Sequence, residues 1–138
     1  MHPVIVRTFK VDVTPPAGDY LCGGLHSKPA IGVESPLSLR GIILEQDAHR
    51  CVMASVEYCY LCGRSHNRMI EALSSAAQTT PHRVTIHSVH THDAPLINEE
   101  AHGLIAKVIP GIHNERYFSD VIEDTKHAIT RSLSGKGT

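Results

Sequence analysis

A strand, a helix and a second strand follow one another in the middle of the chain, and this order constrains the fold more than any other feature. Residues 51–58 are predominantly apolar, which predicts a strand. From Ser65, apolar residues recur at steps of three and four, which predicts an amphipathic helix that ends at Thr79-Thr80-Pro81. Residues 83–89 predict the second strand. This order favours an α/β fold with a mixed, partly parallel sheet and helices packed on it.

Two further strands are predicted before this unit. Residues 5–13 alternate between apolar and polar side chains until prolines end the pattern. Residues 39–45 predict another strand, which residues 46–50 join to 51–58 as a hairpin. The segment 14–38 is rich in glycine and proline and predicts a long irregular loop. Loops of this length in compact domains are often functional.

Two helices are predicted after the last strand. Residues 99–108 form a short candidate helix. A longer helix begins after Asn114, which is a good N-cap residue, and carries an apolar stripe along one side. A chain of 138 residues can bury one hydrophobic core, so a single domain over residues 1–138 is expected.

Charge and targeting signals limit the classes of function. Lys plus Arg number 13 and Asp plus Glu number 14, which gives a net charge of −1, and only 4% of the residues are aromatic. Because nucleic-acid binding needs a basic surface and often stacking side chains, no nucleic-acid partner is expected. No stretch has the roughly 18 apolar residues of a membrane span, and no secretory signal is visible. The sequence as written is therefore expected to be cytoplasmic, although an export signal trimmed from it would not be visible.

The four cysteines do not match a zinc ribbon or a redox motif. Cys59-Tyr60-Leu61-Cys62 has the spacing of half a zinc ribbon, but Cys22 and Cys51 lie far apart and form no second pair. The interior Tyr-Leu also differs from that of thioredoxin-like pairs. Reduced, mostly buried thiols are expected.

Histidine is in excess, with eleven residues, and His90-Thr91-His92-Asp93-Ala94-Pro95 directly follows the last predicted strand. The carboxyl ends of strands are where α/β sheets usually bind ligands. Residues two apart in an extended chain point the same way, so the imidazoles of His90 and His92 are expected to face one site. Such a pair can hold zinc or move protons. Two histidines exposed in a surface loop are the alternative.

Two known His-x-His patterns do not fit the motif. The metallo-β-lactamase pattern would need Asp and His where this chain has Ala94 and Pro95. The amidohydrolase barrel carries its pair on the first strand, whereas here three predicted strands precede the strand that the pair follows.

Other candidate residues have simpler interpretations. His87 is expected to be packed or hydrogen-bonded within the sheet. The Gly23-Gly24 pair is expected to turn the chain. Three histidines on or beside helices are expected to be solvated, although the first of them could still join a site: His102, His113 and His127.

Five segments together carry a resemblance to one known family. They are Val11-Asp12-Val13-Thr14-Pro15-Pro16-Ala17-Gly18, Gly23-Gly24, Leu39-Arg40-Gly41-Ile42-Ile43-Leu44-Glu45, the acid Glu57 at a strand end, and Ser88-Val89-His90-Thr91-His92-Asp93-Ala94-Pro95. In this order the chain resembles the N-terminal region of neutral/alkaline non-lysosomal ceramidases and their bacterial relatives. The resemblance implies an α/β fold that is the N-terminal portion of a larger catalytic domain.

The resemblance also implies a chemistry. His90 corresponds to a zinc ligand, and His92 to a catalytic residue beside the metal and the scissile amide. Asp93 is a candidate substrate-binding residue. The remaining family ligands, a His, a Glu and a Tyr, come from further along the family's chains. The implied activity is Zn²⁺-dependent hydrolysis of amide (N-acyl) or ester bonds in a small-molecule or lipid-like N-acyl substrate.

Two functional hypotheses follow, because catalytic zinc takes three or more protein ligands and His90 alone cannot hold it. The chain is either part of a zinc-dependent hydrolase, inactive by itself, or a non-catalytic fragment or pseudoenzyme that acts as a binding module. A domain cut from a larger sheet leaves an unpaired strand edge and an apolar face. Self-association as a homo-oligomer is therefore expected.

Overall fold

The computed structural model describes residues 3–109, 112 and 114–135, and it has an α/β fold around a mixed four-stranded sheet. The strands lie in the order β1 (Ile5–Asp12), β4 (Ser38–Gln46), β5 (His49–Val56) and β7 (Val84–Ser88). The first three pair antiparallel, whereas β7 runs parallel to β5. The predicted mixed sheet is confirmed, and each predicted strand ends within two residues of the observed one.

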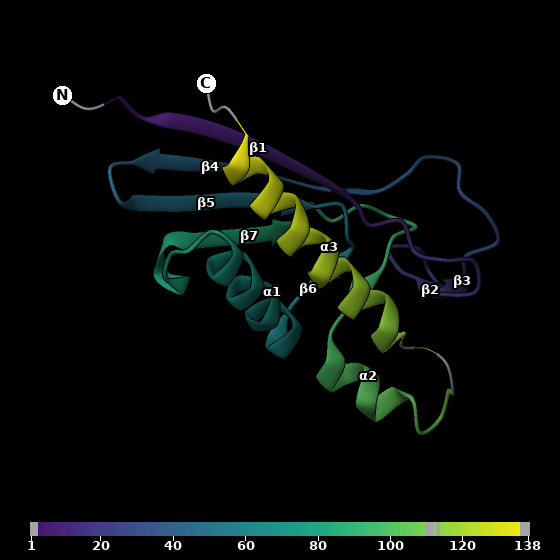
Figure 1. Cartoon of the computed structure of the whole chain (residues 1–138). Coiled ribbons are helices and arrows are strands. Elements are labelled where there is room, and N and C mark those ends of the chain that lie inside the picture. Colours follow the sequence, from purple (N-terminus) through teal and green to yellow (C-terminus); the bar gives the residue numbers. More distant parts are fainter. Residues whose placement is uncertain (1–2, 110–111, 113, 136–138) are drawn as a thin grey trace.

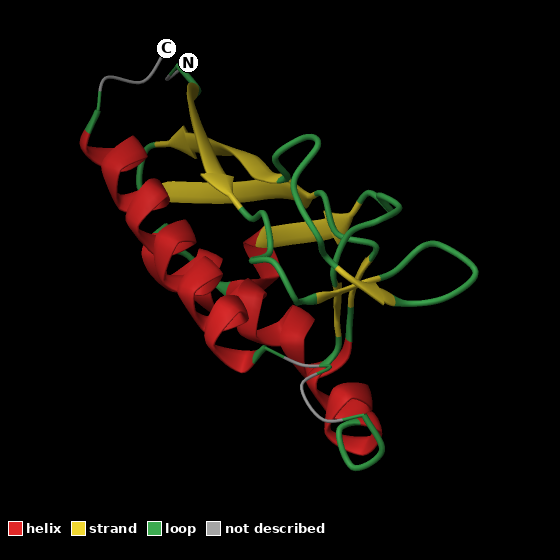
Figure 2. Cartoon of the chain, turned by 90° about the vertical axis from the view of Figure 1, so that its right-hand side faces the viewer, coloured by secondary structure: helices red, strands yellow, loops and turns green. Residues whose placement is uncertain are grey.

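Two helices cover one face of the sheet and leave the other face open (Figures 1 and 2). Helix α1 (Gly63–Ala76) and a 3-10 turn (Pro81–Arg83) form the crossover between the parallel strands β5 and β7. Helix α3 (Glu115–Ser134) packs on α1 and on β1. The predicted N-cap is confirmed, because Asn114 Oδ1 accepts a hydrogen bond from Tyr117 N–H at 3.0 Å. No helix in the described ranges is long and apolar enough to cross a membrane.

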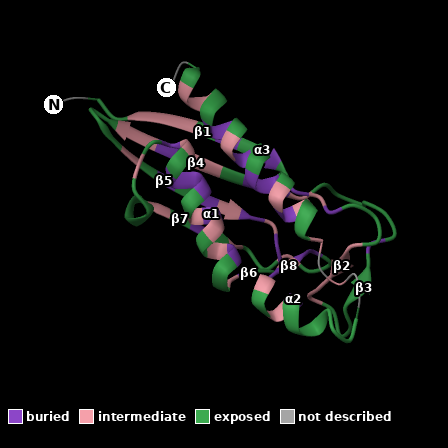
Figure 3. Ribbon diagram, turned by 60° about the horizontal axis from the view of Figure 1, so that its bottom comes forward, coloured by how far each residue is buried: buried purple, intermediate pink, exposed green. Residues whose placement is uncertain are grey.

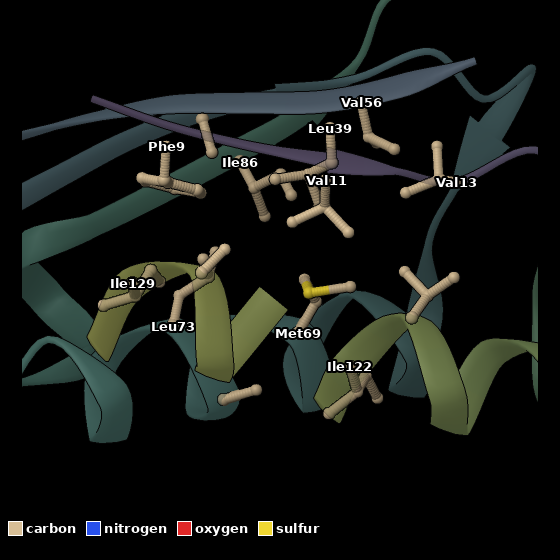
Figure 4. Packing of buried hydrophobic residues seen from close by; sticks show 14 of the residues in the cluster. Phe9, Val11, Val13, Leu39, Val56, Met69, Leu73, Ile86, Ile122 and Ile129 are labelled. Atoms are coloured by element: carbon tan, nitrogen blue, oxygen red, sulfur yellow. The ribbon is translucent and has the colours of Figure 1, made fainter. Parts of the chain in front are cut away.

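The hydrophobic core lies between the sheet and these two helices (Figure 4). Buried and exposed residues alternate along β5 and the second half of β1, so every second side chain there points towards the helices. Both helices carry buried residues on one side and exposed residues on the other (Figure 3). Burying a large aliphatic side chain contributes about 1.5–3 kcal/mol, so this layer supplies most of the stability. Its central members are Val11, Leu39, Val56, Met69, Leu73, Ile86, Ile122 and Ile129.

Two short strand pairs lie beyond the main sheet. Strand β2 (Tyr20–Leu21) pairs antiparallel with β3 (Lys28–Pro29), and β6 (Tyr60–Leu61) pairs parallel with β8 (Leu96–Ile97). The segment 14–38 was predicted to be an irregular loop. This prediction is wrong for part of the segment, which contains the β2–β3 hairpin. Strands of two residues carry no detectable periodicity, so the sequence pattern does not reveal them.

Helix α2 (Glu99–Ile105) ends three residues earlier than predicted and completes the N-terminus of α1. Cys62 is the N-cap of α1 but supplies no side-chain hydrogen bond to it. Instead Glu100 Oε2 accepts a hydrogen bond from Arg64 N–H at 3.2 Å. A carboxylate at a helix N-terminus is favourable, so α2 and α1 are joined by this contact.

The uncovered face of the sheet is partly apolar. Ile42 and Met53, the latter 51% exposed, line an open groove of about 620 Å³ beside Lys10. His87 also lines this groove and is exposed, so the prediction that it is packed or hydrogen-bonded within the sheet is wrong. Its neighbour Ile86 points into the core, and alternation along the strand therefore directs His87 to the open face.

We expect Met53→Lys to weaken self-association of the purified chain by at least about tenfold, because a charge inside an interface must be desolvated. Sedimentation analysis over a concentration series measures the effect. Leu104→Lys adds the same charge at an exposed position of α2 and is the matched control. Equal association of the wild type and Met53→Lys, or a monomer at every concentration, would show that the open face is not the contact surface.

Candidate functional site

The histidine segment lies at the carboxyl ends of the two parallel strands. Because β5 and β7 run side by side in one direction, the residues that follow them are also neighbours. Val89 N–H donates to the carbonyl of Val56 at 3.0 Å, and Thr91 N–H donates to that of Tyr58 at 3.3 Å. These two bonds fix the backbone on both sides of His90.

The backbone of this segment is not extended. His90 has φ 62° and Asp93 has φ 53°, in the left-handed region. This conformation costs roughly 1–2 kcal/mol for a residue with a side chain. The imidazoles of His90 and His92 were expected to face one site because an extended chain was expected here. The chain is not extended, so this reason is wrong. The rings nevertheless meet, with centroids 5.2 Å apart and planes at 83°.

His90 is held in a defined orientation by two neighbours. Its Nδ1 lies 3.1 Å from the carbonyl oxygen of Cys59. Because a carbonyl only accepts, Nδ1 carries the proton in this contact, and in the neutral ring Nε2 keeps its lone pair. The ring of Tyr60 approaches edge-on, with centroids 4.9 Å apart. Metal-binding histidines are commonly oriented by such a hydrogen bond to a backbone carbonyl.

Gly23 lies directly against His92. A Cβ at Gly23 would be 2.7 Å from His92 Cα and 2.9 Å from two ring carbons, and Gly23 has φ 99°. The neighbouring Cys22 N–H donates to the carbonyl of Ala94 at 2.8 Å. The sequence pattern predicts only a turn at Gly23. No local pattern indicates this close approach, because Gly23 and His92 are remote in sequence.

The two acidic candidates have other partners. Asp93 forms an ion pair with Lys28 at 3.2 Å, and both side chains are exposed. Glu57 accepts hydrogen bonds from Ser38 N–H at 2.6 Å and from Ser38 Oγ at 2.7 Å. The hydroxyl of Ser38 is the main reason that the pKa of Glu57 lies below its ordinary value, and the backbone N–H adds to the effect. Glu57 is thus occupied in joining β4 to the end of β5.

Cys59 lies close to His90 but is not an activated nucleophile. Its Sγ is 3.8 Å from His90 Nδ1. Burial is the main cause that raises the pKa of the Cys59 thiol, and Cys22 raises it further, so the thiol is protonated at neutral pH. All four cysteines are free, as expected, but only Cys59 is buried.

The described residues do not complete a metal site. They contain no group of three or more His, Cys, Asp or Glu side chains that could hold a metal ion. The imidazole of His90 suits zinc as a ligand, whereas the number of ligands falls short of the three or more that zinc takes. Zinc at His90 therefore needs ligands from other residues.

The remaining histidines differ in part from expectation. His102 was expected to be solvated but is buried, with only 7% of its surface exposed. It lines a small cavity with Asp19 and Tyr117, so the turn of α2 that carries it faces the residue before β2 and the first turn of α3. His127 is exposed on α3, as predicted. His113 lies outside the described residues.

We expect Gly23→Ala to destabilise the chain more than Gly18→Ala does, and to move the ring signals of His92 in NMR spectra. Both glycines have positive φ, which costs an alanine about 1–2 kcal/mol. Only Gly23 has a neighbour that a Cβ would touch, so Gly18→Ala measures the backbone strain alone. Equal losses of unfolding free energy in urea, with unchanged His92 signals, would contradict the close approach.

We expect Glu57→Gln to lower the unfolding free energy at pH 7 by about 1 kcal/mol, because a charge-assisted hydrogen bond is lost. The pKa of Glu57 is lowered in the folded state from the ordinary 4.5. Its contribution is therefore complete above about pH 4.5 and is lost as the pH falls through the lower folded pKa. Urea unfolding at pH 7 and at pH 3 should show a smaller difference between variant and wild type at pH 3. An equal difference at both pH values would contradict this assignment.

The chain shares its fold with part of known ceramidases. Neither the protein-family models nor the curated proteins gave a match to this sequence. The crystal structure of neutral ceramidase from Pseudomonas aeruginosa matches with a TM-score of 0.67 and 17% identity, over 97% of this chain and 22% of that chain. A ceramidase complexed with C2 matches with a TM-score of 0.65, 17% identity and the same coverage. The chain thus spans about a fifth of the length of these proteins, and the resemblance expected from its sequence is confirmed as a likeness of fold.

Proposed function

We propose that this chain contributes to the active site of a zinc-dependent hydrolase of amide (N-acyl) or ester bonds. One observation carries the proposal. The rings of His90 and His92 lie 5.2 Å apart at the carboxyl ends of parallel strands, in a fold shared over 97% of the chain with proteins named ceramidases. This edge of an α/β sheet is the usual place for a ligand.

His90 acts in this proposal as one zinc ligand. Its orientation supports the role, since the Cys59 carbonyl accepts from Nδ1 and leaves the Nε2 lone pair available. The other ligands come from further parts of a larger catalytic domain, of which residues 1–138 form the N-terminal part. The length of the matched ceramidases, of which this chain covers 22%, supports that arrangement.

His92 is the residue proposed to act on the substrate. Its ring is exposed and stands edge-on to His90, so it can accept a hydrogen bond from a substrate group or move a proton. Asp93 follows it and could bind a polar substrate group, but only by exchanging its ion pair with Lys28. Both side chains of that pair are well exposed, so the exchange costs little.

The proposed substrate is a small-molecule or lipid-like N-acyl compound. Its class is taken from the name of the matched proteins. The loop that holds Gly23 supports an apolar group in the substrate, because Leu25, two residues along the chain from Gly23, is 98% exposed. Gly23 is the residue in contact with His92.

A binding module is the second candidate function. The observation in its favour is that the described residues contain no group of three metal-ligating side chains. In that case the fold and the histidine pair bind a partner or a small molecule without chemistry. Hydrolysis of N-acyl substrates by the longest product of the gene separates the two functions.

We expect zinc to bind the 138-residue chain weakly and His90→Ala to lower the affinity by about tenfold, as the loss of an oriented ligand does. Isothermal titration with zinc measures both. His127→Ala removes an exposed histidine of α3 and is the matched control. Equal zinc affinity in the wild type and His90→Ala would remove His90 as a ligand.

We expect the 138-residue chain, purified alone, to hydrolyse no N-acyl or ester substrate above a zinc-free control. The described residues supply too few ligands to hold a catalytic zinc ion. Robust zinc-dependent turnover that disappears in His92→Ala would show that the residues of this chain complete the site by themselves.

A further inference from the structure

The β2–β3 hairpin carries Gly23 and therefore helps to set the position of His92. Its strands pair over only two residues each, and a hairpin of this size is not stable in water without further contacts. Towards the histidine segment it is bound through the backbone bonds between Cys22 and Ala94, at 2.8 and 3.4 Å. Its other end needs a separate anchor.

A side-chain contact provides that anchor on the helix layer. Asn114 Nδ2 donates to the two carboxylate oxygens of Asp19, at 2.9 and 3.1 Å. Both residues are half-buried, and they are separated by 95 positions in the sequence. A hydrogen bond to a carboxylate is roughly twice as strong as one between neutral groups. The contact therefore ties the start of the hairpin to the start of α3.

Asn114 is itself firmly placed. Its Oδ1 caps α3 by accepting from Tyr117 N–H, so its amide group can turn only Nδ2 towards Asp19. The Tyr117 hydroxyl donates to the carbonyl of Val13 and lies 3.0 Å from the hydroxyl of Tyr58. Tyr58 is fully buried, so the chain of contacts from the hairpin ends in the core.

Asp19 also fixes the backbone of the hairpin. Its carbonyl accepts a hydrogen bond from Ala30 N–H at 2.8 Å, and Gly18 N–H donates to the carbonyl of Ala30 at 2.8 Å. Asp19 thus pairs with Ala30 at the open end of the hairpin, and its side chain holds this same end to Asn114. Three residues further on, Cys22 bonds to Ala94, and Gly23 packs on His92.

We propose that Asp19 and Asn114 are positioning residues that hold the β2–β3 hairpin against α3 and, through Gly23, keep His92 beside His90. The effect on catalysis rests on the proposed function of His92. The positional effect does not, because it concerns only contacts within this chain.

The test is Asn114→Asp, which keeps an oxygen to cap α3 but places two carboxylates together. Aspartate and asparagine are equally good N-caps, so helix content should not change. We expect the amides of Cys22 and Ala94 to exchange with deuterium at least about tenfold faster, because the hairpin opens locally. The ring signals of His92 should move in NMR spectra. The exchange of Tyr117 N–H should stay as in the wild type.

The double variant Asp19→Asn with Asn114→Asp reverses donor and acceptor, and it should restore slow exchange and the original His92 signals. Asn98→Asp is the matched control, because Asn98 caps α2 in the same way and donates to Cys62 Sγ instead of the hairpin. Asp19→Ala leaves the α3 cap intact and should reproduce the effect of Asn114→Asp. Unchanged amide exchange and unchanged His92 signals in both Asp19→Ala and Asn114→Asp would overturn the proposal. This outcome does not depend on any hydrolytic activity.

Discussion

The parallel pairing of β5 with β7 is the constraint on which the candidate site depends. Parallel neighbours need a crossover, and α1 supplies it on the covered face of the sheet. The carboxyl ends of both strands then lie at the same edge. That is why the carbonyl of Cys59, just after β5, reaches the ring of His90, just after β7. In an antiparallel pair these two residues would lie at opposite ends of the sheet.

The left-handed backbone at His90 turns the chain so that two histidine rings meet edge-to-face. Unfavourable backbone conformations persist only where neighbouring contacts fix them. Here the fixing contacts are the bonds from Val89 and Thr91 to the segment after β5, together with the hairpin that holds Gly23 against His92. The site is therefore built from three segments that are distant in sequence, and the histidine motif is only one of them.

The site combines regular elements with contacts between remote segments, and this difference explains how much could be predicted from the sequence. Long elements such as β4 and α1 have a clear period, and their existence and type were predicted. The bounds of β4 were predicted within one residue, and those of α1 within two residues at its start and three at its end. The position of the histidine motif at a strand end followed from them. The contact of Gly23 with His92 and the burial of His102 arise from packing between remote segments. No local pattern encodes such packing, and the two-residue strands were missed for the same reason.

The orientation of His90 does not depend on a bound metal. Its partners are a backbone carbonyl and the ring of Tyr60, both supplied by the segment around β6, so the Nε2 lone pair is already directed when no other ligand is present. An incomplete set of ligands should then appear as weak zinc affinity and not as a misfolded chain. The N-terminal part of a hydrolase and a non-catalytic binding module would therefore share this structure. The ligands that join His90 would distinguish them, because the fold and the histidine pair are the same in both.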